Sequence, residues 1–141
     1  MSTNTLAPAQ PAAVLRIGLW IAQLLLFVAF GAAGVIKLLT PISRLAAMMP
    51  WTGEHSETFV RTIGLVDLAG GLGILLPALV RIMPRLTVLA ALGCAVLQCF
   101  AIVFHLARGE AAVTPVNLVL LALAVFVLWG RSRKAPIPSR L

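Results

Sequence analysis

The chain has 141 residues, of which 61% are hydrophobic and only 11% are charged, and its mean hydropathy is +1.06. A soluble domain is usually about 45–50% apolar and about 25% charged, so this composition excludes a soluble enzyme, a disordered chain and a secreted disulfide scaffold. The net charge of +7 does not indicate nucleic-acid binding, because the basic residues lie at the ends of apolar runs, where they act as topology signals.

Residues 1–13 are rich in Ala, Pro, Thr and Gln, and we expect a flexible tail there. Four apolar runs follow, and the longer ones reach the roughly 20 residues that cross a bilayer as a helix. The runs cover residues 15–39, 60–80, 86–107 and 115–129. The sequence therefore predicts an all-α membrane protein, a four-transmembrane-helix bundle over residues 14–131, with a basic tail over 132–141.

The connections between the runs differ in length. Pro77 and Pro84 bracket a tight basic turn between the second and third runs, and Pro115 suits the first turn of the fourth. The long connection, residues 40–59, has four apolar residues at helical spacing: Ile42, Leu45, Ala46 and Met49. This pattern predicts a short interfacial helix between the first two spans. Residues 52–57 are typical of a solvated turn, and His55 among them lacks the fixed ligand geometry of a metal site.

The distribution of basic residues predicts the orientation in the membrane. Four spans place both termini on one side, and that side carries seven basic residues: Arg16, Arg81, Arg85, Arg131, Arg133, Lys134 and Arg140. The opposite side carries four: Lys37, Arg44, Arg61 and Arg108. The positive-inside rule therefore predicts that both termini are cytoplasmic. Among the membranes of a bacterium, helical spans would favour the inner one for such a multi-pass protein.

Small residues inside the runs predict close helix packing. They are Gly31 and Gly34, then Gly70, Gly71 and Gly73, and finally Ala90 with Cys94. Cys94 and Cys99 lie five residues apart, so on one helix they point about 140° away from each other. We therefore expect packing roles for both cysteines and no disulfide between them.

Five polar side chains within the runs need an explanation, because an ionisable group at the centre of a span costs about 2.5–3.5 kcal/mol on insertion scales. They are Lys37, Asp67, Gln98, His105 and Asn117. Asp67 lies about six residues, roughly 9 Å, inside the second run, and Gln98 lies two turns from His105. Lys37 and His105 lie near the ends of the first and third runs, and Asn117 lies near the start of the fourth. All four helices thus contribute polar groups to the half opposite the termini. This placement predicts an inward-facing cluster with Lys37 and Asp67 as its ion pair.

The sequence leaves alternatives open for each of these residues. Lys37 can extend outward to the headgroups, and Asp67 can form a salt bridge that only fixes helix register. His105 and Asn117 fit interhelical hydrogen bonds as well as ligand binding or proton handling, while Gln23 and Gln98 are typical polar contacts between helices. With one histidine inside the runs and no metal-ligand spacing, we expect neither haem nor metal.

Several segments together resemble the DoxX-like family of small four-span bacterial membrane proteins, over about residues 15–130. The segments are 34–38, 41–51, 63–73, 76–77, 86–87, 90–93, His105, 108–110 and Asn117. The resemblance implies that Lys37, Asp67, His105 and Asn117 are the family's polar positions. Asp67 stands where the family typically has Glu, so the carboxylate here is shorter by one methylene. The family is named for a subunit of a thiosulfate:quinone oxidoreductase, and some relatives are linked to thiol and oxidative-stress defence.

Two classes of function follow from these observations. In the first, the cluster binds a small molecule such as a quinone headgroup, as part of a membrane redox or stress-response system with a redox partner protein. Lys37 and His105 would donate hydrogen bonds, and Asp67 would orient the ligand or exchange a proton. In the second, the protein is an accessory or scaffold subunit that docks another membrane protein. A proton or small-solute carrier is less favoured, because four spans would need a homo-oligomer to build a pathway. The sequence contains no self-contained catalytic motif.

Overall fold

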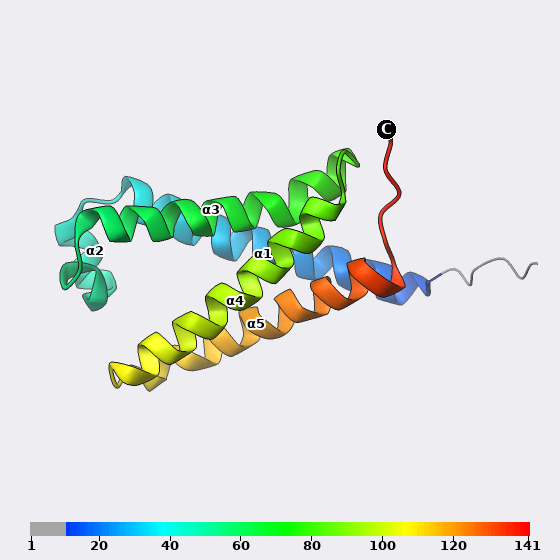
Figure 1. Ribbon diagram of the computed structural model, residues 1–141. Coiled ribbons are helices and arrows are strands. Elements are labelled where there is room, and N and C mark those ends of the chain that lie inside the picture. The colour runs from blue at the N-terminus through cyan, green and yellow to red at the C-terminus, as the bar shows by residue number, and fades with distance from the viewer. Residues whose placement is uncertain (1–10) are drawn as a thin grey trace, which may run out of the picture.

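The computed structural model describes residues 11–141 and consists there entirely of helices and connecting turns (Figure 1). The tail predicted over residues 1–13 falls largely on residues 1–10, which lie outside the described part of the chain. Four long helices run antiparallel: α1 (Ala13–Leu39), α3 (Glu57–Val80), α4 (Arg85–Ala107) and α5 (Thr114–Trp129). Each lies in a segment long and apolar enough to cross a membrane, and many large apolar side chains face outward. The predicted all-α bundle of four spanning helices is therefore confirmed.

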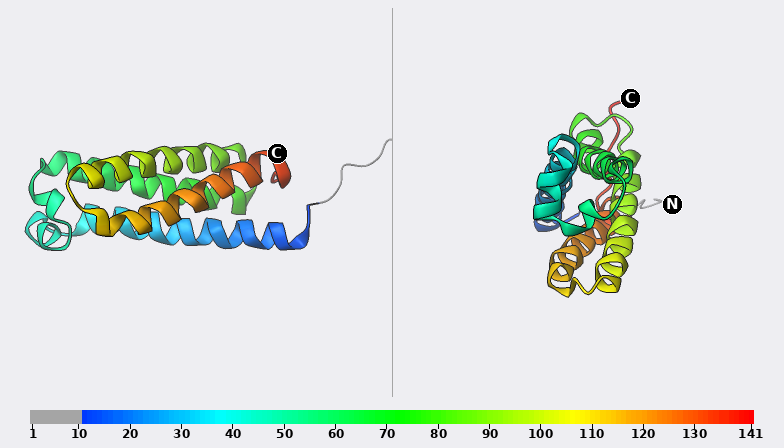
Figure 2. Two further views of the ribbon diagram at one scale, coloured as in Figure 1. Left: turned by 90° about the horizontal axis from the view of Figure 1, so that it is seen from below. Right: turned by 90° about the vertical axis from the view of Figure 1, so that its left-hand side faces the viewer.

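Short elements occupy the two ends of the bundle. We call the end that holds the start of α1 and the C-terminal segment the terminal end, and the opposite end the distal end (Figures 1 and 2). The distal end holds α2 (Ile42–Met48) with the 3-10 turns η1 (Pro50–Gly53) and η2 (Ala111–Val113), while the π-helical turn η3 (Gly130–Lys134) follows α5 at the terminal end. The short helix predicted between the first two spans is confirmed as α2.

The predicted start of α3 is wrong, whereas its predicted end at residue 80 is confirmed, although Pro77 does not lie at the edge of the following turn. The helix begins at Glu57, three residues earlier than predicted, because the Ser56 side chain accepts a hydrogen bond from the backbone N–H of Phe59 (3.2 Å) and caps the helix. At the other end Pro77 lies inside the helix, which continues to Val80. The turn to α4 is therefore only residues 81–84.

Helices α1 and α3 approach each other so closely that only glycine fits between them. A Cβ atom on Gly34 would stand 2.7 Å from the backbone oxygen of Gly64, and one on Gly71 would stand 2.9 Å from the backbone nitrogen of Gly31. Close backbone approach of this kind is how membrane helices gain packing contacts without a hydrophobic driving force. The glycine pairs therefore fix the relative position of α1 and α3.

Helices α3 and α4 also meet through small residues. Cβ atoms on Gly70 and Gly73 would stand 2.8 Å from Cys94 Sγ and 2.9 Å from Ala90 Cβ, respectively. Cys94 is buried in this contact, whereas Cys99 on the same helix is exposed, and both thiols are free. The predicted packing role holds for Cys94.

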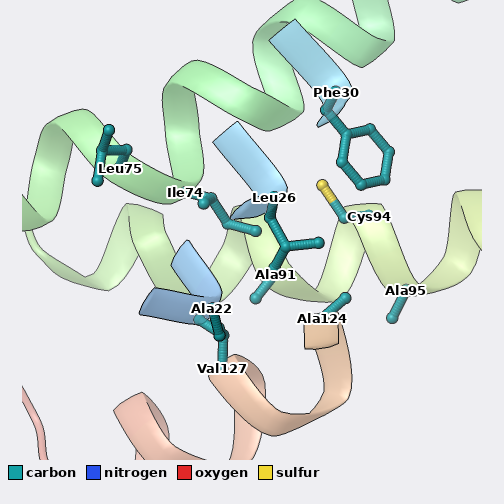
Figure 3. Packing of buried hydrophobic residues seen from close by; sticks show 10 residues of the cluster. All are labelled: Ala22, Leu26, Phe30, Ile74, Leu75, Ala91, Cys94, Ala95, Ala124 and Val127. Carbon is teal, nitrogen blue, oxygen red and sulfur yellow. The ribbon is translucent and has the colours of Figure 1, made fainter. Parts of the chain in front are cut away.

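Apolar side chains fill the centre of the bundle, and a smaller cluster lies at the distal end. The central cluster, shown in Figure 3, contains Ala22, Leu26, Phe30, Ile74, Leu75, Ala91, Cys94, Ala95, Ala124 and Val127. The distal cluster contains Leu45, Trp51 and Val60 and packs α2 and η1 onto α3. From the terminal end outward, the α4–α5 pair diverges from the α1–α3 pair (Figure 1).

Candidate functional site

A cavity of about 590 Å³ occupies the distal half of the bundle. Its wall is mostly apolar and comes from all four long helices, with α2 and η1 at its distal end. All five polar residues singled out from the sequence line it: Lys37, Asp67, Gln98, His105 and Asn117. Phe30, Trp51 and Phe104 contribute aromatic surface. The structure thus brings residues 80 positions apart in the sequence to one concave site.

Lys37 and Asp67 form a buried ion pair between α1 and α3. Lys37 Nζ lies 2.8 Å from Asp67 Oδ2, and the two side chains are 10% and 8% exposed. Because α3 begins at Glu57, Asp67 lies ten residues, roughly 15 Å, along the helix, deeper than the sequence predicted. Lys37 reaches it because helical side chains lean toward the helix N-terminus, which for α1 is the interior of the bundle. The alternative in which Lys37 extends to the headgroups is wrong.

The surroundings of this pair explain how the two helices come close enough. A Cβ on Gly64 would stand 2.9 Å from Lys37 Cβ, so glycine makes room for the lysine stem. At the same level Arg61 donates to the backbone oxygens of Lys37 and Thr40, the latter at 2.8 Å, and pairs with Glu57 at 2.9 Å. A cation on the last carbonyls of a helix is favourable. Arg61, which the sequence reasoning counted only as a charge, therefore caps α1.

Gln98 and Asn117 each bring an unused hydrogen-bonding atom to the cavity region. Gln98 Oε1 and Asn117 Nδ2 are buried, and neither has a hydrogen-bond partner within the described part of the chain. A buried polar atom without a partner costs about 1–3 kcal/mol. The interhelical hydrogen bond considered for Asn117 is therefore not made by Nδ2. One acceptor and one donor are left beside the same cavity.

His105 is held by Glu110, a residue that the sequence reasoning did not assign to the site. The two side chains meet at 2.6 Å between His105 Nδ1 and Glu110 Oε2. Gly109 adopts a left-handed φ of +74°, and the backbone N–H of Glu110 donates to the oxygen of His105 (2.9 Å) while that of Gly109 donates to Leu106 (3.0 Å). These two bonds form a Schellman motif. It turns the chain back so that Glu110 lies over His105 and also lines the cavity.

A charged clasp joins the two helix pairs at the distal end. Arg108 binds Glu54 through two bonds of 2.6 and 3.0 Å and also lies 3.1 Å from a carboxylate oxygen of Glu110. The hydrogen bond from Arg108 lowers the pKa of Glu54 below its ordinary value. The pKa of Glu110 is lowered first by the hydrogen bond from His105 and then by that from Arg108. Both carboxylates are therefore held in the charged form.

His55 follows Glu54 in the sequence and packs against aromatic residues at the distal end. Its Nδ1 donates to the backbone oxygen of Trp51 (2.8 Å), and its ring contacts Phe59 and Phe104. Over residues 11–141 no group of three His, Cys, Asp or Glu side chains is placed to hold a metal ion. His55 thus supports the aromatic wall of the cavity.

The terminal half of the bundle contains a different polar cluster, away from the cavity. Gln23 is fully buried, donates through Nε2 to the backbone oxygen of Ile74 (2.8 Å) and accepts at Oε1 from Arg131 Nε (2.7 Å). Arg131 also lies over the ring of Trp20, 4.8 Å from its centroid. Gln23 therefore has the interhelical bonding role expected of it. The partner, Arg131, was assigned only as a topology signal.

The fold and site define a class of protein: a multi-pass membrane protein of four apolar helices with a polar-lined cavity in one half. Residues 21–127 match the DoxX-like family, and the chain therefore belongs to that family. A search of curated proteins finds no match, and a search of solved structures finds none either.

Proposed function

We propose that this DoxX-like protein binds a small redox-active molecule of the quinone class in the distal cavity. The observation that carries the proposal is the pair of unpartnered buried atoms, Gln98 Oε1 and Asn117 Nδ2, at a mostly apolar cavity of about 590 Å³. Small-molecule sites typically measure about 300–1,000 Å³ and combine apolar walls with a few convergent polar groups. A quinone has the same combination, an apolar ring and tail with polar oxygens.

The two unpartnered atoms fit the two forms of such a ligand. Asn117 Nδ2 is a donor and suits the carbonyl oxygen of a quinone, whereas Gln98 Oε1 is an acceptor and suits the hydroxyl of a quinol. Lys37 Nζ has three donors, and Asp67 accepts one of them, so the others are available to a carbonyl. The site therefore offers hydrogen-bond donors to a quinone carbonyl and an acceptor to a quinol hydroxyl.

The His105–Glu110 pair gives the site a group that exchanges protons. Because Nδ1 donates to Glu110, the other ring nitrogen of a neutral His105 is an acceptor, and it becomes a donor when the ring is protonated. Asp67, in contrast, is already paired with Lys37. We therefore place proton exchange at His105 and electrostatic orientation at the Lys37–Asp67 pair. Electrons would pass to or from a redox partner protein in the same membrane.

The proposal includes a location and an orientation. Helical spans favour a bacterial inner membrane, and the seven basic residues near the terminal end favour a cytoplasmic position for both termini. The cavity would then lie in the outer half of the bilayer, where the diffusing pool of lipid-soluble quinone can reach it.

An accessory or scaffold role is the second candidate, and one observation favours it. The Lys37–Asp67 pair is complete in itself, with 2.8 Å between the charged atoms and little exposure. Such a pair can lock the register of α1 and α3 without any ligand. In that case the protein would contribute only its outer surface to a larger membrane complex.

Fluorescence quenching by a short-chain quinone tests the proposal directly. Trp51 lines the cavity, whereas Trp20 and Trp129 belong to the terminal halves of α1 and α5. We expect saturable quenching in the wild type that is largely lost in Trp51→Phe. Asn117→Leu removes one hydrogen bond to the quinone and should weaken its affinity about tenfold.

Thr114→Val is the matched control for Asn117→Leu. Thr114 lies one turn earlier on α5 and also has an unpartnered buried oxygen, but it does not line the cavity. The control should bind quinone like the wild type. Equal affinity in Asn117→Leu, or no saturable quenching in a folded wild type, would reject the quinone site and favour the accessory role.

A further inference from the structure

A second cavity, of about 520 Å³, lies at the terminal end, far from the distal site. Its wall comes from the α3–α4 turn, the first residues of α4 and the C-terminal segment: Met83, Pro84, Arg85, Leu86, Val88, Arg131, Pro136, Ile137 and Ser139. The C-terminal segment follows η3 and returns to the turn (Figure 1), where Arg140 N donates to Arg81 O (2.9 Å). Arg81 Nε in turn donates to Pro138 O (3.1 Å). These contacts hold the C-terminal segment against the α3–α4 turn.

Arg131 is built into this cavity with part of its guanidinium unused. It is 6% exposed, and its Nε and Nη1 donate to Gln23 Oε1 (2.7 Å) and Ala135 O (3.2 Å). Its Nη2 is buried and has no partner among residues 11–141. Two bonds and the Trp20 ring thus fix the guanidinium plane while one donor nitrogen is left. A fixed arginine with a free donor is suited to an oxyanion.

The charges around the cavity all have the same sign. Arg85 also lines it and is exposed, so a second guanidinium is available at its mouth. The four acidic residues of the chain lie elsewhere, at the distal end or in the middle of α3: Glu54, Glu57, Asp67 and Glu110. No acidic side chain therefore competes for the two arginines. The first turn of α4, which also borders the cavity, adds the favourable end of a helix dipole.

From these observations we propose that the cavity binds a phosphoryl group, in the form of the headgroup of an anionic phospholipid. Basic pockets between membrane helices at the cytoplasmic surface commonly bind such headgroups. The phosphate oxygens accept from Arg131 Nη2 and the Arg85 guanidinium. The acyl chains lie along the exposed apolar residues at the start of α4, Leu86 and Leu89. This site is independent of the distal cavity and of any quinone.

Native mass spectrometry of the full chain with phosphatidylglycerol or phosphatidylcholine tests the proposal. Arg85→Gln is the informative variant, because Arg85 is exposed and Arg131 also holds Gln23 in place. We expect the wild type to retain phosphatidylglycerol in preference to phosphatidylcholine, and Arg85→Gln to weaken the phosphatidylglycerol affinity about fivefold, the effect of one basic residue near an anionic headgroup.

Arg133→Gln is the matched control, since it removes the same charge from an exposed arginine of η3 that does not line the cavity. It should retain phosphatidylglycerol nearly as the wild type does. Equal losses in both variants, or equal retention of the two lipids, would overturn the proposal in favour of diffuse surface charge. Excess inorganic phosphate separates the sources: displacement of the lipid shows that the phosphoryl group suffices, and resistance shows that the lipid body is also recognised.

Discussion

Gln23 and Gln98 are both glutamines buried inside spanning helices, but their surroundings differ. Both polar atoms of the Gln23 side chain are hydrogen-bonded, Nε2 to Ile74 and Oε1 to Arg131. The residue lies outside the distal cavity. Gln98 lines the cavity, and its Oε1 has no partner within the described residues. The same residue type thus stabilises the terminal half and leaves an open binding position in the distal half.

This contrast separates two uses of polar residues in a membrane. A buried polar group that is fully bonded holds helices together. If its hydrogen bonds break, the separated donors and acceptors have no water with which to replace them. A buried polar group left without a partner destabilises the apo protein, and where it lines a cavity it is available to a ligand that completes its bonds. The Lys37–Asp67 pair combines both features, because it is bonded and still faces the cavity.

The largest effect is expected from breaking that ion pair. Asp67→Ala leaves the Lys37 charge buried without a partner, and loss of one member of a buried pair typically costs about 3–5 kcal/mol. We expect the free energy of unfolding, measured by denaturant titration in detergent, to fall by about this amount. The double variant Lys37→Met/Asp67→Leu should recover most of the loss, because it removes both charges. A stable Asp67→Ala single variant would contradict the pairing.

The next effect concerns the terminal half. Gln23→Leu removes an acceptor from the charged Arg131 and a donor from Ile74, and hydrogen bonds to charged groups contribute about 1.5–3 kcal/mol. We expect the same unfolding measurement to show a loss within this range. Quinone quenching of Trp51 should remain unchanged, because Gln23 does not line the cavity. A weakened quinone affinity would show that Gln23 also affects the distal site, and would contradict the separate roles of the two halves.

Much of the fold and part of the candidate site could be predicted from the sequence, and the reasons are local. Apolar runs of near-spanning length predicted α1, α3, α4 and α5, and glycines predicted the seams at which they meet. The common level of Lys37, Asp67, His105 and Asn117 predicted their convergence, since a straight helix converts sequence spacing into depth. Gln98, two turns from His105, was expected deeper on a similar face. The start of α3 was missed because the Ser56 cap adds a turn before the apolar run.

The rest depended on turns and on contacts distant in sequence. Glu110 meets His105 only because Gly109 adopts a positive φ, and an Arg-Gly-Glu sequence at a helix end was the signal available. Arg108 pairs with Glu54, which lies 54 positions earlier in the sequence, and no spacing rule predicts such a pair. Which buried amide atoms are bonded follows from side-chain geometry, so the difference between Gln23 and Gln98 required the structure.

Gln98→Leu is the matched counterpart of Gln23→Leu and sharpens the comparison. Removing an unpartnered buried acceptor should leave the free energy of unfolding unchanged or raise it by about 1 kcal/mol. The affinity for the quinol form should fall about tenfold, the value of one hydrogen bond. Unfolding and ligand titration of both glutamine variants, side by side, measure this. Destabilisation of Gln98→Leu equal to that of Gln23→Leu would place both residues in the same structural role.

The smallest effect is expected at the clasp that joins the two helix pairs distally. The pKa values of Glu54 and Glu110 are lowered from an ordinary value of 4.5, so their stabilisation is complete above that value and is lost as the pH falls through the folded pKa. We expect the melting temperature of the wild type to fall below about pH 4.5. Glu54→Gln should melt lower at neutral pH and converge with the wild type in acid.

Glu57→Gln supplies the control for this last comparison. Glu57 is also a distal carboxylate, but it pairs with Arg61 one helical turn away and its side chain is 64% exposed, a surface arrangement that contributes little. Its melting curve should follow the wild type at every pH. Glu54 and Arg108 connect the two helix pairs around the cavity. If Glu54→Gln also changes the pH dependence of quinone affinity, the stability of the distal end is linked to ligand binding there. Parallel curves for Glu54→Gln and the wild type would instead show that the aromatic contacts of Trp51 and Phe104 hold the distal end closed without the clasp.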